Sequence, residues 1–374
     1  MIVYFSQITQ SYAEAMLIFS IYNIIYALSK IPAGLFSDKV GRKPVILLGS
    51  LMLAVSFFIL ALSGQLNIKY LLFLFSVLWG MGEALISGTI DALMFETMEE
   101  LNRPEDFRMV YSKSMISDQL GCAIGAATTM FMTYFFSIQY VAWLSVIPVT
   151  AQFFISTLFI EPKVRNSKSD LSTLKTFAVF KQFVKNKRLC FYAIMDIYFS
   201  TLGDISHRFE SAYFKTFTAD WVISMARVLK HLFGMLGFFV ISQIKKFGST
   251  SIYFSSIGCN VVVRTIALCF NNIFTPFISM FINFFYATAA TAKSDILQHE
   301  FLPQYRASAQ AIIFFIKGLY MSLIMYLLGI IADSRGILYA MSAMVMMRII
   351  GLLLAYIWHK FENIQTLFKR NKDV

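Results

Sequence analysis

Charge, proline and cysteine are all scarce in this sequence. Of its 374 residues, 14% are Asp, Glu, Lys or Arg, whereas a soluble protein carries about 25%. The four cysteines and four histidines are scattered, and no C-x-x-C pair occurs, so neither a zinc site nor a disulfide framework is supported. We expect no metal and no cofactor.

Catalytic and nucleotide-binding motifs are missing too. The sequence contains no G-x-x-x-x-G-K-[ST] phosphate loop, so ATP could drive this chain only through a partner subunit. It also lacks a Ser-His-Asp set and a metalloprotease helix motif. The formal charge of +11 does not indicate nucleic-acid binding, because such binders concentrate charge on polar surfaces, whereas basic residues here punctuate apolar runs. The sequence therefore predicts neither an enzyme nor a nucleic-acid-binding protein.

Long apolar runs fill the rest of the chain, which is 58% hydrophobic. A bilayer-spanning helix needs about 20 mostly apolar residues, and these runs are too long and too uniform for barrel strands, which alternate. The sequence predicts an all-α membrane protein with about 11 complete spans. We expect them at 15–36, 44–63, 70–95, 110–135, 140–160, 189–214, 220–243, 250–270, 275–297, 307–332 and 337–358.

The basic residues gather in alternate connections between these runs. If the connection at 37–43 lies in the cytoplasm, 21 of the 32 Lys and Arg residues fall in cytoplasmic segments and three in external loops. Lysine and arginine favour the cytoplasmic side. We therefore expect a multi-pass protein of the cell membrane whose C-terminus is cytoplasmic.

The stretch GLFSDKVGRKP, residues 34–44, puts four charges into six positions between two apolar runs. Gly34 and Gly41 are expected to permit close approach and a tight turn, and Pro44 suits the first turn of a helix. The pattern resembles the signature loop of the major facilitator superfamily, G-x-x-x-D-[RK]-x-G-R-[RK]. Its residues here are Gly34, Asp38, Lys39, Gly41, Arg42 and Lys43.

Three further stretches, 87–93, 302–308 and 328–333, are similar to later parts of that family. The resemblance implies a major facilitator fold of two six-helix halves joined by a cytoplasmic linker. We expect an N-terminal transmembrane half at 1–160 and a linker with an interfacial helix at 161–188. A C-terminal half at 189–358 and a basic cytoplasmic tail at 359–374 complete the predicted organisation.

The N-terminus departs from the family. The run resembling the second span already occupies 15–36, so MIVYFSQITQSYAE resembles the outer end of span one plus an external loop. We therefore expect 11 complete spans and an N-terminal stub. A start site placed too late and a truncated gene are both open explanations.

The family resemblance also implies a gating cluster. Members often close their cytoplasmic face with the Asp and Arg of the signature loop and an acid at the inner end of span four. Asp91 is the residue expected in that place, beside Asp38 and Arg42. Breaking such a cluster would shift the conformational equilibrium.

Ionisable residues inside the spans are costly in lipid and are functional candidates by default. Glu83 lies near the middle of the fourth family span, where it suits proton coupling. A static pair with Lys30 or another cation is the alternative interpretation, and Lys30 and Asp118 are the candidates for structural ion pairs.

The densest group of charges falls in the two spans after the linker. Asp204, His207 and Arg208 share a helix face, with Glu210 one step round, and Arg227, Lys230 and His231 share a face of the next span. Counting residues from the turn between the two spans places Glu210 and Arg227 at similar depth in the membrane. The same count places Asp204 level with Lys230 or His231. Two interpretations stay open: a substrate or proton site, to which Asp204, His207, Glu210, Arg227 and Lys230 would contribute, and an ion-pair lock between adjacent helices.

Together these features predict a secondary active transporter, an antiporter or symporter, that moves a small solute by alternating access. We expect proton coupling, with efflux favoured over uptake, and a monomer surrounded by the lipid bilayer. A polytopic enzyme would show a clustered nucleophile or metal set, and a channel would show no linker between two halves. A truncated, inactive transporter remnant is a third alternative.

The orientation is testable by labelling single introduced cysteines in intact cells. A membrane-impermeant thiol reagent should modify cysteines at Asn271 or Asn272 and should leave those in 161–188 and 359–374 unmodified until the cells are opened. Labelling of 161–188 in intact cells would contradict the orientation and the interpretation of residues 34–44.

Overall fold

The computed structural model describes residues 1–103, 106–162, 187–243, 248–300 and 306–370. Within these ranges the chain is helical, and no strand occurs. The helices are α1 (Ile2–Thr9), α2 (Tyr12–Val40), α3 (Arg42–Leu66), α4 (Tyr70–Glu100), α5 (Phe107–Phe135), α6 (Ile138–Thr157), α8 (Lys187–Phe214), α9 (Asp220–Gln243), α10 (Ser249–Phe270), α11 (Thr275–Ile278), α12 (Met280–Glu300), α13 (Arg306–Arg335) and α14 (Ile337–Arg370).

The helices agree with the all-α membrane fold predicted from the sequence, and each predicted span falls on a helix except 275–297, which is divided between α11 and α12. Eight helices in the described part of the chain are long and apolar enough to cross a membrane. Helix α8 is not among them, because Asp196, Asp204, Arg208 and Glu210 interrupt its apolar sequence. Such charges are tolerated in a span only when they face the interior of the bundle.

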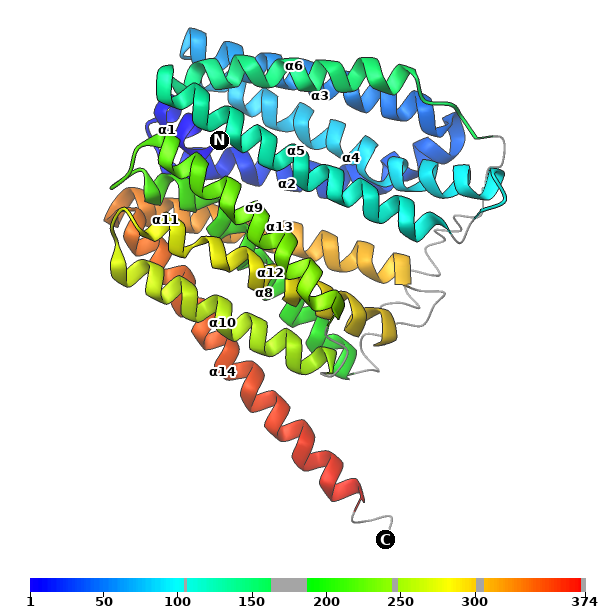
Figure 1. The fold of residues 1–374 in the computed structure, drawn as a ribbon, viewed down its shortest axis with the longest axis vertical. Helices are drawn as coiled ribbons and strands as arrows, with labels where there is room; N and C mark the ends of the chain where they lie inside the picture. Colours follow the sequence, from blue (N-terminus) through cyan, green and yellow to red (C-terminus); the bar gives the residue numbers. More distant parts are fainter. Residues whose placement is uncertain (104–105, 163–186, 244–247, 301–305, 371–374) are drawn as a thin grey trace.

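The helices form two groups, the α1–α6 half and the α8–α14 half, which lie one above the other in Figure 1. Helix α2 packs against α13, and α5 packs against α9, so these two pairs join the halves. Helix α14 runs on past the bundle to Arg370 (Figure 1), so residues 359–370 of the predicted tail continue the last span as a helix. The predicted linker helix and the stretch 302–305 lie outside the described residues.

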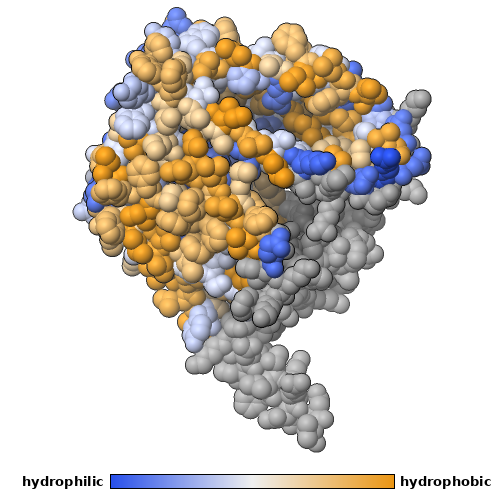
Figure 2. All heavy atoms as spheres, in the orientation of Figure 1, coloured by the Kyte–Doolittle hydropathy of each residue, from blue (hydrophilic) through white to orange (hydrophobic). Residues whose placement is uncertain are grey.

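The outer surface is apolar. Figure 2 shows hydrophobic residues over most of the visible face of the bundle. Large exposed side chains of this kind include Ile147 and Phe154 of α6, which are 64% and 63% exposed. A soluble protein rarely exposes a continuous apolar surface of this extent. The surface is suited to lipid.

The two ends of the bundle are closed differently. We name them the Arg42 end, where α2 passes into α3, and the Asp333 end, where α2 begins. A buried apolar cluster at the Asp333 end includes Phe5, Phe19 and Phe75 from one half and Phe209 and Met325 from the other. The second buried cluster lies within the α8–α14 half alone. The apolar core therefore joins the halves toward the Asp333 end.

Asp333 adds a polar contact across the halves at that end. Its carboxylate accepts hydrogen bonds from the backbone N–H of Tyr12 at 2.6 Å, from that of Ala13 at 3.0 Å and from the Ser11 hydroxyl at 2.6 Å. The first N–H groups of a helix lack intrahelical partners and carry partial positive charge. Asp333 of α13 thus caps α2 of the opposite half.

Close packing follows the same pair of helices below the cap. A Cβ atom added at Gly329 of α13 would lie 2.7 Å from Cα of Ala13. Only glycine lets the two backbones approach this closely. Further along, Ser20 and Ser322 each donate to the other's backbone carbonyl, at 2.9 and 3.1 Å. The contact between α2 and α13 is therefore tight from the Asp333 end as far as Ser20 and Ser322.

Candidate functional site

The sequence motif at 34–44 forms the end of one helix and the start of the next. Helix α2 continues to Val40, and Gly41 alone separates it from α3, with φ 118° and ψ 161°. That backbone conformation favours glycine, which agrees with the predicted tight turn. The close approach expected at Gly34 is wrong, since a Cβ atom added there would meet nothing within 4 Å.

Arg42 is the centre of a buried polar cluster, which we call the Arg42 cluster. Its guanidinium donates to both oxygens of Glu96 through Nε and Nη2, with Nη2 2.7 Å from Oε1. Nη1 donates to Asp38 Oδ1 at 2.6 Å. Glu161, which follows α6, accepts from the backbone N–H of Arg42 and Lys43 at 2.7 and 2.6 Å. The ends of α2, α3 and α4 and the chain after α6 are thereby joined within one half.

The acid on α4 that pairs with Arg42 is Glu96 and not Asp91, so the residue expected for this cluster was wrong. Asp91 lies five residues earlier in α4 and is exposed, too far from the end of the helix to reach the turn at Gly41. Glu96 is 3% exposed. Lys39, the basic residue in the last turn of α2, is exposed.

A cavity of about 410 Å³ lies in the α8–α14 half. It is lined by residues of α8, α9, α10, α12, α13 and α14 and reaches α5 of the other half at Gln119. Volumes of this order hold small organic ligands. Its charged lining residues, counting both histidines, are Asp196, Asp204, His207, Lys230, His231, Arg264, Lys293, Lys317 and Arg348.

Two carboxylates of α8 in this cavity hold lysines of other helices. Asp196 lies 2.9 Å from Lys293 of α12, and Asp204 lies 2.7 Å from Lys317 of α13. The predicted pairing of Asp204 with Lys230 or His231 is wrong. Adjacent spans do not determine this contact, because α13 reaches the same face of α8 from the far end of the chain.

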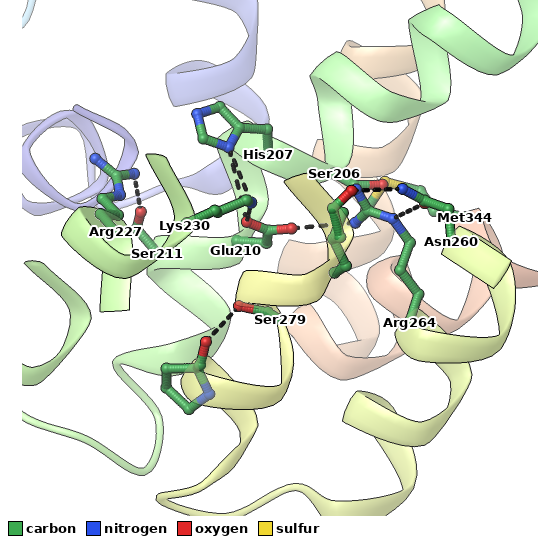
Figure 3. Close-up of polar contacts among 12 residues, drawn as sticks. Ser206, His207, Glu210, Ser211, Arg227, Lys230, Asn260, Arg264, Ser279 and Met344 are labelled. Atoms are coloured by element: carbon green, nitrogen blue, oxygen red, sulfur yellow. Dashed lines mark hydrogen bonds and ion pairs between the residues drawn. The ribbon is translucent and has the colours of Figure 1, made fainter. Parts of the chain in front are cut away.

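Glu210 is the most densely paired acid in the structure (Figure 3), and we call its group the Glu210 cluster. Its Oε2 accepts from Lys230 of α9, and its Oε1 lies 3.1 Å from Arg264 of α10. His207 lies one turn earlier, with Nδ1 3.7 Å from Oε2. Glu210, Lys230 and Arg264 are all at least 93% buried. The carboxylate therefore ties three helices together.

The predicted pairing of Glu210 with Arg227 is wrong by about one helical turn. Arg227 donates to the Ser211 hydroxyl instead, and Lys230 takes the place beside Glu210. His231, on the same face, is within 3.2 Å of Gln119 of α5. Both interpretations of these charges therefore find support. Glu210 forms an ion-pair lock between helices, and Asp204, His207 and Lys230 line a cavity.

The sequence does not single out Asn260, and it identifies Arg348 only as one of the ionisable residues inside the spans. The side-chain oxygen of Asn260 accepts from Arg264 Nε at 3.0 Å and from Arg348 Nη1 at 3.3 Å. Arg348 of α14 is 3% exposed, and its Nε and Nη2 have no hydrogen-bond partner among the residues that the structure describes. A charged residue inside a span was the available signal, but its neighbours come from helices distant in sequence.

Glu83 and Lys30 lie apart from this cavity. Glu83 of α4 is half-buried, and no described residue gives it an ion pair. Lys30 of α2 lies 4.4 Å from the ring centre of Phe314 and 3.3 Å from the hydroxyl of Tyr26. The suggested structural pairs are wrong for Lys30 and Asp118: Asp118 is exposed and accepts only from Gln119, at 3.3 Å, among the described residues.

Comparisons with known proteins agree with this architecture. A sequence model of the Major Facilitator Superfamily matches residues 1–207. A solved structure of the nucleoside transporter NupG, in a mutant form, superposes with a TM-score of 0.75 at 15% identity, covering 94% of this chain and 92% of that chain. A D-xylose-proton symporter gives a TM-score of 0.69 at 15% identity, covering 92% and 86%. No curated protein sequence matches this chain.

The Glu210 cluster makes a prediction about stability. Glu210→Gln leaves Lys230 and Arg264 buried without their counter-charge, which should cost about 3–5 kcal/mol of folding free energy. The measurement is the melting midpoint and yield of the purified protein. Asp220→Asn is the control, because Asp220 pairs with Lys215 at a partly exposed site and such pairs contribute about 0–1 kcal/mol. Equal melting of the two variants would contradict the structural role given to Glu210.

Proposed function

The chain belongs to the major facilitator superfamily, and from that membership we propose that it is a secondary active transporter. It moves a small solute across the cell membrane by alternating access, and its two helical halves rock against each other around the cavity. It works as a monomer in the bilayer and is coupled to protons. Efflux as the favoured direction stays a prediction.

The observation that carries this proposal is the closure of the Asp333 end by a contact across the two halves. At the Asp333 end, Asp333 of one half caps α2 of the other. At the Arg42 end, the ion pairs of Arg42 with Asp38 and Glu96 lie within one half. Alternating access requires contacts across the halves that form at one end and open at the other. With the basic connections in the cytoplasm, the closed Asp333 end faces outside.

Small solutes fit the volume of the cavity. The structures similar in fold are named for transport of nucleosides and of D-xylose with protons. They suggest the first test solutes, uridine and D-xylose. At 15% identity they do not identify the solute that this chain moves.

Glu83 is the proposed proton carrier. Glu210 and Asp204 each hold a cation at close range, so protonating them would leave that cation unpaired. Glu83 has no such partner among the described residues, and half-buried placement in α4 makes the neutral form accessible.

The gate is tested by Asp333→Ala. Losing a helix cap costs about 0.5–2 kcal/mol, which changes a two-state population by a factor of about 5–30 at the upper half of that range. A cysteine at Ser200, which lines the cavity, should then be labelled faster from the Asp333 side, in a background without the four native cysteines. Ser334→Ala is the control, because its hydroxyl bonds only within its own helix. Unchanged labelling would contradict the gate.

The coupling is tested in vesicles that contain a pH-sensitive dye and either wild type, Glu83→Gln or Asp204→Asn at matched protein levels. A panel of nucleosides, pentoses and organic acids is added, and proton entry is recorded for each solute. Glu83→Gln should abolish solute-driven proton entry while exchange of the same labelled solute survives. The reverse result, with Asp204→Asn uncoupled and Glu83→Gln coupled, would move the proton site into the α8–α14 half. Normal coupling in both would mean that neither acid carries the proton.

A further inference from the structure

Arg348 is a buried cation that forms no ion pair with any described residue. It lies on α14 at the wall of the cavity and is 3% exposed. Within the described part of the chain, its one hydrogen bond goes from Nη1 to Asn260, at 3.3 Å, while Nε and Nη2 are buried and have no partner there. Burying an ionised group without a partner is strongly unfavourable, so this guanidinium is a position at which a ligand would gain free energy.

No described carboxylate around the cavity is available to neutralise it. Asp196 and Asp204 lie 2.9 and 2.7 Å from their lysines. Glu210 is held between Lys230 and Arg264. Arg264 also shares the Asn260 oxygen with Arg348. The described lining of the cavity therefore carries positive charge in excess, concentrated where α10 meets α14.

The two unbonded atoms form one edge of the guanidinium. Nε and Nη2 point their N–H groups in parallel, and this fork matches two oxygens of a carboxylate or phosphate. Gly203 of α8 stands beside it: a Cβ atom added there would be 3.5 Å from Nη2, so the absent side chain leaves the edge clear.

A second unbonded donor lines the same cavity. The hydroxyl of Ser200, one turn before Asp204 on α8, is buried and makes no hydrogen bond with the described ranges of the chain. Buried polar groups are nearly always bonded. An oxyanion bound in the cavity could accept hydrogen bonds from both the Ser200 hydroxyl and the Nε–Nη2 edge of Arg348.

We propose that the transported solute is an organic anion, whose carboxylate or phosphate group binds the Nε–Nη2 edge of Arg348. This inference rests on the proposed transport function and names its substrate class. The ion pairs at Asp196 and Asp204 keep their own lysines occupied, so Arg348 is the binding cation and the remaining volume takes the body of the solute.

The test uses the purified full-length protein in detergent and measures its melting midpoint with defined probes. Lactate and succinate represent carboxylates, glycerol 3-phosphate and inorganic phosphate represent phosphates, and glycerol, D-xylose and uridine are neutral. At about 100 times its Kd, a bound anion should raise the midpoint by about 3 °C, and the neutral probes should not. The separate carboxylate and phosphate arms identify which oxyanion is preferred.

Two variants connect the effect to Arg348. Arg348→Met should abolish the anion effect and, because it removes an unpaired buried cation, should melt no lower than wild type without ligand. Arg348→Lys keeps the charge but loses the two-pronged edge, so anion affinity should fall about tenfold or more, as expected for losing one charge-assisted hydrogen bond. Arg335→Gln, at an exposed site, is the matched control and should behave as wild type.

The outcomes separate this inference from the transport function itself. Proton entry into vesicles driven by a neutral solute, with anions inert, overturns the anion proposal and leaves transport standing. An Arg348→Met protein that melts well below wild type while no anion raises the midpoint also overturns it, because Arg348 would then be a structural cation. Anion binding that depends on Arg348, in vesicles that move none of the panel, supports the site and counts against transport.

Discussion

Charge buried inside a bilayer-spanning bundle needs a partner, and the arrangement of the α8–α14 half follows from that constraint. Desolvation removes the interaction with water that a carboxylate or ammonium would otherwise keep. Glu210 shows the result: its two oxygens face Lys230 of α9 and Arg264 of α10, so one acid holds α8, α9 and α10 in register. Asp196 and Asp204 extend the same pattern to α12 and α13. Helix α8 is thus the acidic core around which basic helices assemble.

The two halves meet under a different rule. Among the described residues, the polar contacts between them include a helix cap at Asp333, paired serines, Lys30 over the ring of Phe314 and His231 beside Gln119, with a glycine-mediated approach of α2 and α13. None of these is a buried ion pair, and each can separate into water at modest cost, since a cap contributes only about 0.5–2 kcal/mol. Strong electrostatic bonds therefore lie within the halves and weak polar bonds lie between them. This distribution suits rigid bodies that move relative to each other.

The sequence predicted what depends on local composition and could not predict what depends on packing. The apolar runs predicted the helices, because the thickness of the bilayer fixes the length of a span. Gly41 predicted the turn, because the backbone angle there favours glycine. The choice of Glu96 over Asp91 was not accessible, because it depends on how far α4 continues beyond Asp91 and on which of its acids then lies beside Arg42. Depth counting across one turn also misplaced Arg227 and Lys230 relative to Glu210. Lys317 and Arg348 belong to α13 and α14 and lie more than 100 residues after α8 in the sequence.

Arg348 differs from Lys230 and Arg264, which pair with Glu210. It also differs from Arg227, which donates to the Ser211 hydroxyl, because two donor atoms of Arg348 are buried without a partner among the described residues. A hydrophobic side chain in its place would remove an unpaired charge and be neutral or stabilising. Its retention is therefore not explained by stability. A site that binds a solute must hold binding groups unsatisfied until the solute arrives, because a guanidinium already paired with a protein carboxylate would have to break that bond first. Asn260 orients Arg348 through a neutral oxygen and leaves its charge uncompensated, which fixes the geometry of the cation without neutralising it.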